Sequence, residues 1–132
     1  MCTITKDLIQ KVWEKGRIID GYDKTIIRQD ACGAWIRFDK YGDRCSVFGW
    51  EIDHIYPKSK LRDRKVPDEE IDCMDNLRPL NWVNNDSKGI DYPVYHARIK
   101  AVDNKNEECD DEYTVNENIQ NHINQLFGKY LK

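Results

Sequence analysis

Apolar residues at helical spacing occur near the start of the chain. Four of them fall on one helix face, at positions i, i+1, i+4 and i+5: Leu8, Ile9, Val12 and Trp13. This pattern predicts a helix over residues 6–15 that ends at Gly16. Residues 17–33 lack such a period and contain several Gly and Asp, so we expect an irregular segment there.

The middle of the chain changes to an extended pattern. Residues 34–38 and 46–55 are rich in aromatic and β-branched side chains, and the cluster 39–43 between them is typical of a turn. We expect these two segments to pair as a hairpin. Residues 56–75 are polar, dense in charge and contain two prolines, which predicts a long loop. Loops longer than about 12–15 residues in a compact domain are often functional.

The next stretch predicts a helix, a strand and a loop. The helix is expected over residues 80–88, with Pro79 in its first turn and Gly89 just past its end. Apolar and polar residues alternate over 95–101, which predicts a half-buried strand. The acidic segment 103–112 is expected to be a loop.

A second long helix is predicted at the end of the chain. Thr114 and Glu117 have the spacing of a capping box, which indicates a helix start. The apolar stripe of this helix is Ile119, Ile123, Leu126, Phe127, Tyr130 and Leu131. Such a stripe predicts that the helix docks on the core, to which we also assign Trp35, Trp50 and Trp82.

Composition narrows the class of protein. The 132 residues include four Trp, seven Tyr and three Phe, enough to anchor the core of one domain. No apolar run approaches the ~20 residues needed to cross a bilayer, and residues 1–20 lack the apolar stretch of a secretory signal. Five cysteines without a CxxC pair indicate reduced thiols and a cytoplasmic location. An unusual metal site that uses Cys32 and Cys45 is the alternative.

The distribution of charge is more informative than the net charge of −3. Residues 28–65 hold nine Lys and Arg against six Asp and Glu, whereas residues 66–132 hold seven against fourteen. A chain with this asymmetry can present a basic working face on an acidic body. The net charge therefore leaves a nucleic-acid partner open.

Five residues in the centre carry the chemistry expected of a phosphodiester hydrolase. Asp53 offers an anionic oxygen suited to Mg²⁺, and the adjacent His54 offers a base that is unprotonated near neutral pH. Asn85 supplies a second oxygen ligand, and Lys88 one turn later supplies a cation for a phosphate. Asn76 alone would be assigned to a turn or cap.

The segment EIDHIYPKS followed by DNLRPLNWVNNDSKG resembles the HNH endonuclease family, whose active unit is the ββα-metal motif. The resemblance covers nearly half the chain and implies that His54 is the general base and that Asp53 and Asn85 bind one divalent cation. Mg²⁺ is the expected ion, with Mn²⁺ as a substitute. The resemblance also implies that Asn76 holds the loop and the base in orientation without touching the metal. The long segment 56–75 departs from the short connection of many members.

Further residues are expected to bind the DNA backbone. A basic run directly follows the Asp-His pair. Like Lys88, three of its members are assigned to contacts with phosphate: Lys58, Lys60 and Arg62. The acidic residues that follow, beginning at Asp68, could fold back on this run. Glu51 is expected to form a salt bridge, whereas Asn81 and Asn84 are expected at the helix surface or cap.

The whole chain is thus predicted to be one α+β domain. A ββα-metal (HNH) core over about residues 30–89 is expected to carry an N-terminal helix and a C-terminal extension, residues 90–132, of a strand plus a helix. The predicted activity is metal-dependent hydrolysis of DNA phosphodiester bonds. The alternatives are a nuclease that acts on RNA, a toxin or defence effector, and a non-catalytic nucleic-acid-binding module. Double-strand cuts would need a homodimer, a partner protein or two events.

Overall fold

The computed structural model describes residues 4–132, in which five α-helices and three two-stranded antiparallel sheets confirm the α+β class. The helices are α1 (Lys6–Trp13), α2 (Lys58–Asp63), α3 (Asp68–Ile71), α4 (Trp82–Lys88) and α5 (Glu117–Phe127), with 3-10 turns at Phe38–Lys40, Met74–Asn76 and Gly128–Tyr130. The strand pairs are β1 (Ile27–Gln29) with β2 (Trp35–Arg37), β3 (Trp50–His54) with β4 (Leu77–Asn81), and β5 (Val94–Val102) with β6 (Lys105–Thr114).

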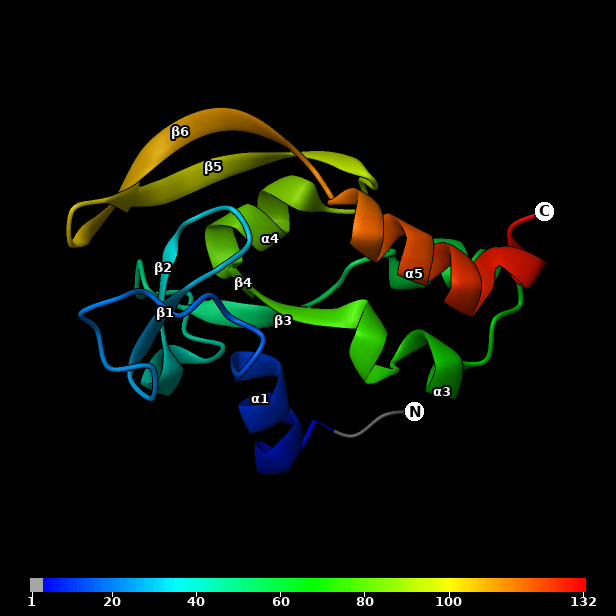
Figure 1. The fold of residues 1–132 in the computed structure, drawn as a ribbon, viewed down its shortest axis with the longest axis horizontal. Helices are drawn as coiled ribbons and strands as arrows, with labels where there is room; N and C mark the ends of the chain where they lie inside the picture. The colour runs from blue at the N-terminus through cyan, green and yellow to red at the C-terminus, as the bar shows by residue number, and fades with distance from the viewer. Residues whose placement is uncertain (1–3) are drawn as a thin grey trace.

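The β3–β4 ribbon lies in the middle of the molecule (Figure 1). The helix α4 continues directly from β4 and lies between this ribbon and the long β5–β6 hairpin. On the other side of the ribbon lies α1, and α5 lies beside the connection between β3 and β4. The site therefore rests on a strand, a long connection, a strand and a helix in consecutive order.

The predicted hairpin between residues 34–38 and 46–55 is wrong. The β2 strand pairs with β1, with Ile27 opposite Arg37, and β3 pairs with β4, with His54 opposite Leu77. Residues 38–49 do not return along β2, because a 3-10 turn and bends change the direction of the chain. Within this segment Gly49 lies so close to the Asp43 carbonyl that a Cβ would clash. Local patterns give the strands but not the partner of each strand.

Three segments predicted to be irregular contain regular structure. The segment 56–75 holds α2 and α3, both begun at prolines that fix the backbone before the first helical residue. The acidic segment 103–112 largely forms β6, because its partner β5 supplies the hydrogen bonds and a basic residue such as Lys100 opposite the acids. The segment 17–33 likewise includes β1.

The helix predictions are right in position and wrong in two details. The α1 helix begins after Thr5, whose hydroxyl accepts a hydrogen bond from the Leu8 amide. Pro79 lies in β4 opposite Ile52 rather than in a helix. The cap of α5 is Asn116, whose side chain accepts a hydrogen bond from the Ile119 amide, and not Thr114.

Two hydrophobic clusters hold these elements together. The first gathers the α5 stripe against the β3–β4 connection and β5, and its buried members include Ile71, Leu80, Ile123 and Phe127. The second packs α1 against β2 and β3 through Val12, Trp13, Ile36, Trp50 and Leu77. Trp35 and Trp50 are buried as predicted, and Trp82 is half-buried.

Buried polar residues tie α4 to its neighbours. Asp30 accepts hydrogen bonds from Asn81, Asn84 and two amides of its own turn. Asn81 caps α4 as expected. The prediction for Asn84 is wrong, because its buried amide bonds the β5 backbone at Arg98 and Ile99, where the β5–β6 register shifts.

No helix among residues 4–132 has both the length and the apolar character needed to cross a membrane.

Candidate active site

His54 lies at the last position of β3, where the strand opens into the connection toward β4. Its side chain is 25% exposed and lines two adjoining hollows of about 300 and 250 Å³. Asn85 lines both hollows from α4, and Lys58 lines both from α2. The structure therefore brings the predicted base and one predicted metal ligand to the same depression, although they are 31 positions apart.

Asp72 orients the His54 ring. His54 Nε2 lies 2.7 Å from Asp72 Oδ1, and Lys58 Nζ lies 3.0 Å from both oxygens of the same carboxylate. Burial alone would raise the pKa of the Asp72 carboxyl, but hydrogen bonds from His54 and Lys58 outweigh this effect and lower that pKa. Asp72 is thus an anion that holds an imidazole and an ammonium group in place.

Sequence reasoning did not identify Asp72 as a site residue. The sequence suggested that the acidic run could fold back on the basic run, and it does: Asp72 pairs with Lys58 and Asp68 pairs with Arg62. Only the packing of α2 against α3 decides which acid reaches His54. No spacing signal in the chain marks Asp72.

Asn76 holds the connection between the two strands. It is fully buried, and its side chain bonds both backbone groups of Tyr56 and the carbonyl of Ile71. Its own carbonyl accepts a hydrogen bond from the Ile55 amide, one residue after the base. These bonds fix the exit of β3, which matches the predicted loop-holding role.

Asp53 faces a different environment from His54. Its carboxylate accepts a hydrogen bond from Arg78 Nε at 3.0 Å and lies 3.4 Å from Lys88 Nζ, and only 4% of the side chain is exposed. Neighbouring residues of a strand point to opposite faces, which explains this separation. Asp53 still borders the smaller hollow together with His54 and Asn85.

Lys88 does not present its charge at the surface. Its side chain is fully buried, and its ammonium also donates to the His54 carbonyl at 3.2 Å. Burial lowers the pKa of Lys88, partly offset by Asp53. The sequence predicted that Lys88 binds a phosphate, whereas in the structure its ammonium is bound by groups of the protein. The reason is that the face of α4 that carries Lys88 packs onto β3.

Glu51 is the second carboxylate near Asn85. Asn85 Nδ2 donates to Glu51 Oε1 at 2.9 Å, and Arg44 binds both Glu51 and Asp86 in a bidentate manner with all four distances at 2.9 Å. The predicted salt bridge of Glu51 is therefore confirmed. Arg44 links the segment before β3 to α4 and so braces the rim of the larger hollow.

The remaining predicted phosphate-binding residues flank the hollows on α2. Lys58 is bound to Asp72, and Arg62 is exposed and bound to Asp68. Lys60 is half-buried and has no ion pair with any residue in the range 4–132. None of the three is buried, so all can approach a polyanion that enters from this side.

The donor atoms at the hollows suit a hard divalent cation. Asp53, Glu51 and Asn85 carry the carboxylate and amide oxygens that Mg²⁺ and Mn²⁺ prefer, but basic groups engage both carboxylates, so a cation would compete with Arg78 and Lys88 for Asp53 and with Arg44 for Glu51. No cluster of three or more His, Cys, Asp and Glu side chains with metal-binding geometry occurs in residues 4–132.

Other candidate residues lie apart from this site. Cys32 is buried whereas Cys45 is exposed, so nothing in the structure supports a site built from both thiols. His96 and His122 are about half exposed and lie beside surface acids, His96 Nδ1 at 3.3 Å from Asp110 and His122 Nε2 at 3.1 Å from Asp75.

No protein-family model matches this chain, no curated protein is significantly similar to it, and no solved structure matches it.

Proposed function

We propose that this chain is a metal-dependent endonuclease of the HNH type that hydrolyses DNA phosphodiester bonds. The observation that carries the proposal is the position of His54, held by Asp72 at the end of β3 in a hollow that Asn85 also lines. These residues sit on consecutive strand, connection, strand and helix, which is the order expected for a ββα-metal core. Asn76 supports the same unit from beneath the connection.

In the proposed reaction His54 is the general base. Asp72 accepts the hydrogen bond from Nε2–H, which leaves the lone pair of Nδ1 free to take a proton from water. The water oxygen forms a bond to phosphorus while the bond to the 3′ oxygen breaks in line, and the leaving 3′ oxygen takes a proton from solvent. The products are a 5′-phosphate and a 3′-hydroxyl end.

The surrounding residues orient the base and the substrate. Asp53 and Asn85 would hold the divalent cation, which when bound supplies positive charge to the reacting phosphate. Arg78 and Lys88 fix the Asp53 carboxylate, and Lys88 also holds the His54 carbonyl. Lys58, Lys60 and Arg62 line the approach from α2, where the DNA backbone would bind.

Incubation of the purified chain with supercoiled plasmid tests this function. Nicked or linear plasmid is expected with Mg²⁺ or Mn²⁺, and intact plasmid is expected with EDTA. A structured RNA in parallel tubes tests the substrate class, and it should remain intact. Plasmid that stays supercoiled in both metals would refute the proposal, whereas cleavage of RNA alone would move the activity to the ribonuclease alternative.

A further inference from the structure

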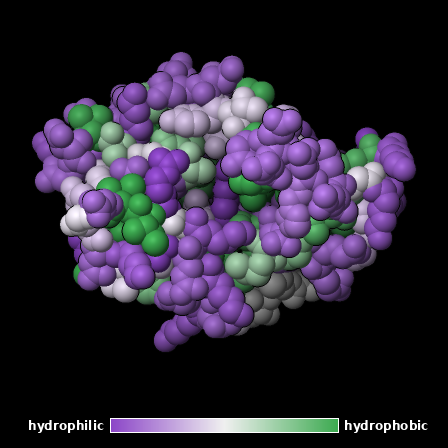
Figure 2. Space-filling view, viewed as in Figure 1, coloured by the Kyte–Doolittle hydropathy of each residue, from purple (hydrophilic) through white to green (hydrophobic). Residues whose placement is uncertain are grey.

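A second cavity lies on the side of the β3–β4 ribbon away from His54. Its volume is about 490 Å³, which falls in the range of small-molecule sites of roughly 300–1,000 Å³. Ile55 and Arg78 line it, whereas their strand neighbours His54 and Leu77 line the hollow of the proposed active site. Figure 2 shows the surface hollowed near the centre of this face, with hydrophilic side chains around the opening.

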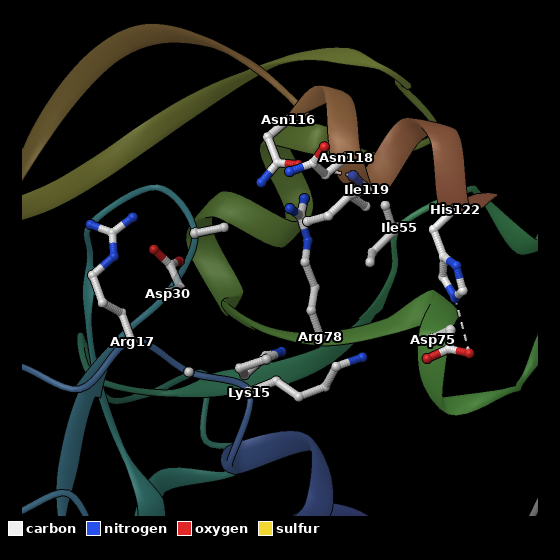
Figure 3. A pocket seen from close by; sticks show the side chains of 13 residues that line it. Lys15, Arg17, Asp30, Ile55, Asp75, Arg78, Asn116, Asn118, Ile119 and His122 are labelled. Atoms are coloured by element: carbon white, nitrogen blue, oxygen red, sulfur yellow. Dashed lines mark hydrogen bonds and ion pairs between the residues drawn. The ribbon is translucent and has the colours of Figure 1, made fainter. Parts of the chain in front are cut away.

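Arg78 projects into this cavity with unused donors. Its side chain is 9% exposed, its Nε donates to Asp53 at 3.0 Å, and its guanidinium lies over the Tyr95 ring, 5.2 Å from the ring centroid. The buried Nη2 has no hydrogen-bond partner among the described residues. Figure 3 shows the guanidinium directed toward Asn116 and Asn118 at the start of α5. A buried guanidinium with unpaired N–H groups is costly unless an acceptor is supplied.

The charges around Arg78 leave an excess of positive charge. Asp53 is shared between Arg78 and Lys88, so one carboxylate faces two basic groups. Arg17 lines the cavity, is exposed and forms no ion pair with the described residues, and the Lys15 ammonium binds the carbonyls of Met74 and Leu77.

The acids that line the cavity are already bound. Asp30 accepts four hydrogen bonds from the protein, and Asp75 lies 3.1 Å from His122. Neither carboxylate is directed to Arg78 by any hydrogen bond or ion pair in the structure. Asp75 also attracts the Lys15 ammonium, whereas Arg78 and Arg17 form no ion pair with either of these acids.

The start of α5 adds a favourable field for an anion. This helix has 11 residues, and its N-cap Asn116 and second residue Asn118 both line the cavity. Helix N-termini carry partial positive charge and free backbone N–H groups. The start of α5 and Arg78 of β4 therefore offer donors to the same part of the cavity, and Arg17 lies at its opposite edge, beyond Asp30 (Figure 3).

We infer that this cavity binds the phosphate group of a small molecule of about nucleotide size, with Arg78 as the phosphate ligand and Arg17 as a second positive charge at the rim. The apolar side chains of Ile55, Pro79 and Ile119 form the wall against which the organic part of the ligand lies. This site is separate from the proposed catalytic hollow and does not depend on the nuclease activity.

Isothermal titration with a mixture of nucleoside 5′-monophosphates, and separately with inorganic phosphate, tests the inference. The intact chain should bind at least one probe. If the apolar wall contacts the organic part of the ligand, the nucleotides should bind more tightly than inorganic phosphate. Arg17→Glu should weaken binding at least tenfold, because it replaces a positive charge at the cavity with a negative one. The substitution breaks no ion pair of the described residues. Lys105→Glu, an exposed reversal in the β5–β6 hairpin, is the matched control and should bind as the parent does.

Two further variants keep the test decisive. Ile119→Trp should block binding by filling the cavity, with folding checked by circular dichroism, and His54→Ala should leave binding unchanged. Absence of binding by the parent at millimolar probe, or equal affinity of Arg17→Glu and the parent, overturns the inference. Displacement of a bound nucleotide by short duplex DNA would also overturn it, because the cavity would then belong to the DNA path.

Discussion

His54 has one ring nitrogen bound to Asp72, and this single contact defines how the base works in the proposed reaction. A carboxylate behind an imidazole selects the tautomer and stabilises the imidazolium that forms on proton transfer. Lys58 binds the same carboxylate, so its ammonium also offsets the negative charge of Asp72.

Replacement of Asp72 tests its positioning role. Asp72→Asn is expected to reduce the rate of plasmid cleavage by about 10- to 10³-fold, because the amide no longer selects the tautomer. The pH profile of the rate should change as well, which a purely structural residue would not cause. Asp68→Asn removes a half-buried partner of Arg62 that does not contact His54 and is the matched control. Equal rates for the two variants would remove Asp72 from the mechanism.

The lowered pKa of Asp72 also predicts a pH dependence of stability. Because this carboxyl is more acidic in the folded state, its contribution to the free energy of unfolding is fully present above the ordinary carboxyl pKa of about 4 and is lost as the pH falls through the lowered value. Urea unfolding should show Asp72→Asn less stable than the parent at pH 7, with a smaller difference near pH 3. A difference that grows in acid would contradict the assignment.

Two carboxylates compete for the role of metal ligand. Asp53→Asn and Asn85→Ala are expected to weaken Mn²⁺ binding by about tenfold or more, since each removes a direct oxygen ligand. Glu51→Gln, which disturbs the Arg44 salt bridge, is the comparison and should retain Mn²⁺ affinity within a few-fold. Calorimetric titration below the unfolding temperature measures all three. Loss in Glu51→Gln alone would transfer the ligand role to Glu51.

At the level of elements, the fold depends on the attachment of α4 to β5. Asn84 supplies this attachment through a buried side chain that bonds Asp30 and the β5 backbone. The same contact lies where the register of β5 with β6 shifts. Asn84 therefore supplies hydrogen bonds to backbone groups at the irregularity in the strand pairing.

Loss of the Asn84 side chain should destabilise the chain strongly. Asn84→Ala leaves buried polar groups unpaired and is expected to lower the free energy of unfolding by about 2–4 kcal/mol. Asn121→Ala, on the exposed face of α5, should change it by less than about 0.5 kcal/mol. Urea unfolding followed by tryptophan fluorescence measures both. A small effect at Asn84 would show that α4 is held by its apolar contacts alone.

The same level shows what the sequence can predict. The helices at 6–15 and after Thr114, and the strand at 95–101, follow from local periodicity and are confirmed. The partner of β3 is β4, which begins 23 residues after β3 ends, so it depends on long-range packing that no local pattern reports. The acids of β6 resemble a loop until β5 provides the pairing strand.

The candidate site divides in the same way. His54, Asn76 and Asn85 could be selected from the resemblance to the HNH motif, and the structure places all three at or beneath one depression. Asp72 and the burial of Lys88 could not be selected, because the first depends on how α2 and α3 fold and the second on how α4 packs.

On the scale of the whole molecule, acids are concentrated on β6, whereas the basic residues of α2 are partly paired with acids of the β3–β4 connection. The exposed acids of β6 lie on the hairpin that covers α4, across the molecule from α1 (Figure 1). The basic residues of α2 lie beside the proposed active site. With a net charge of −3, binding to DNA should be weak, and cleavage should fall as salt rises because phosphate contacts release counterions.

The central claim is that His54 is the base of a DNA-cleaving site, and plasmid nicking by matched histidine variants tests it most directly. In Mg²⁺ the parent and His96→Ala, an exposed substitution on β5, should nick supercoiled plasmid at similar rates. His54→Ala, folded by circular dichroism, should be slower by about 10²-fold or more, the usual contribution of a general base. Equal nicking by His54→Ala and the parent would contradict the account.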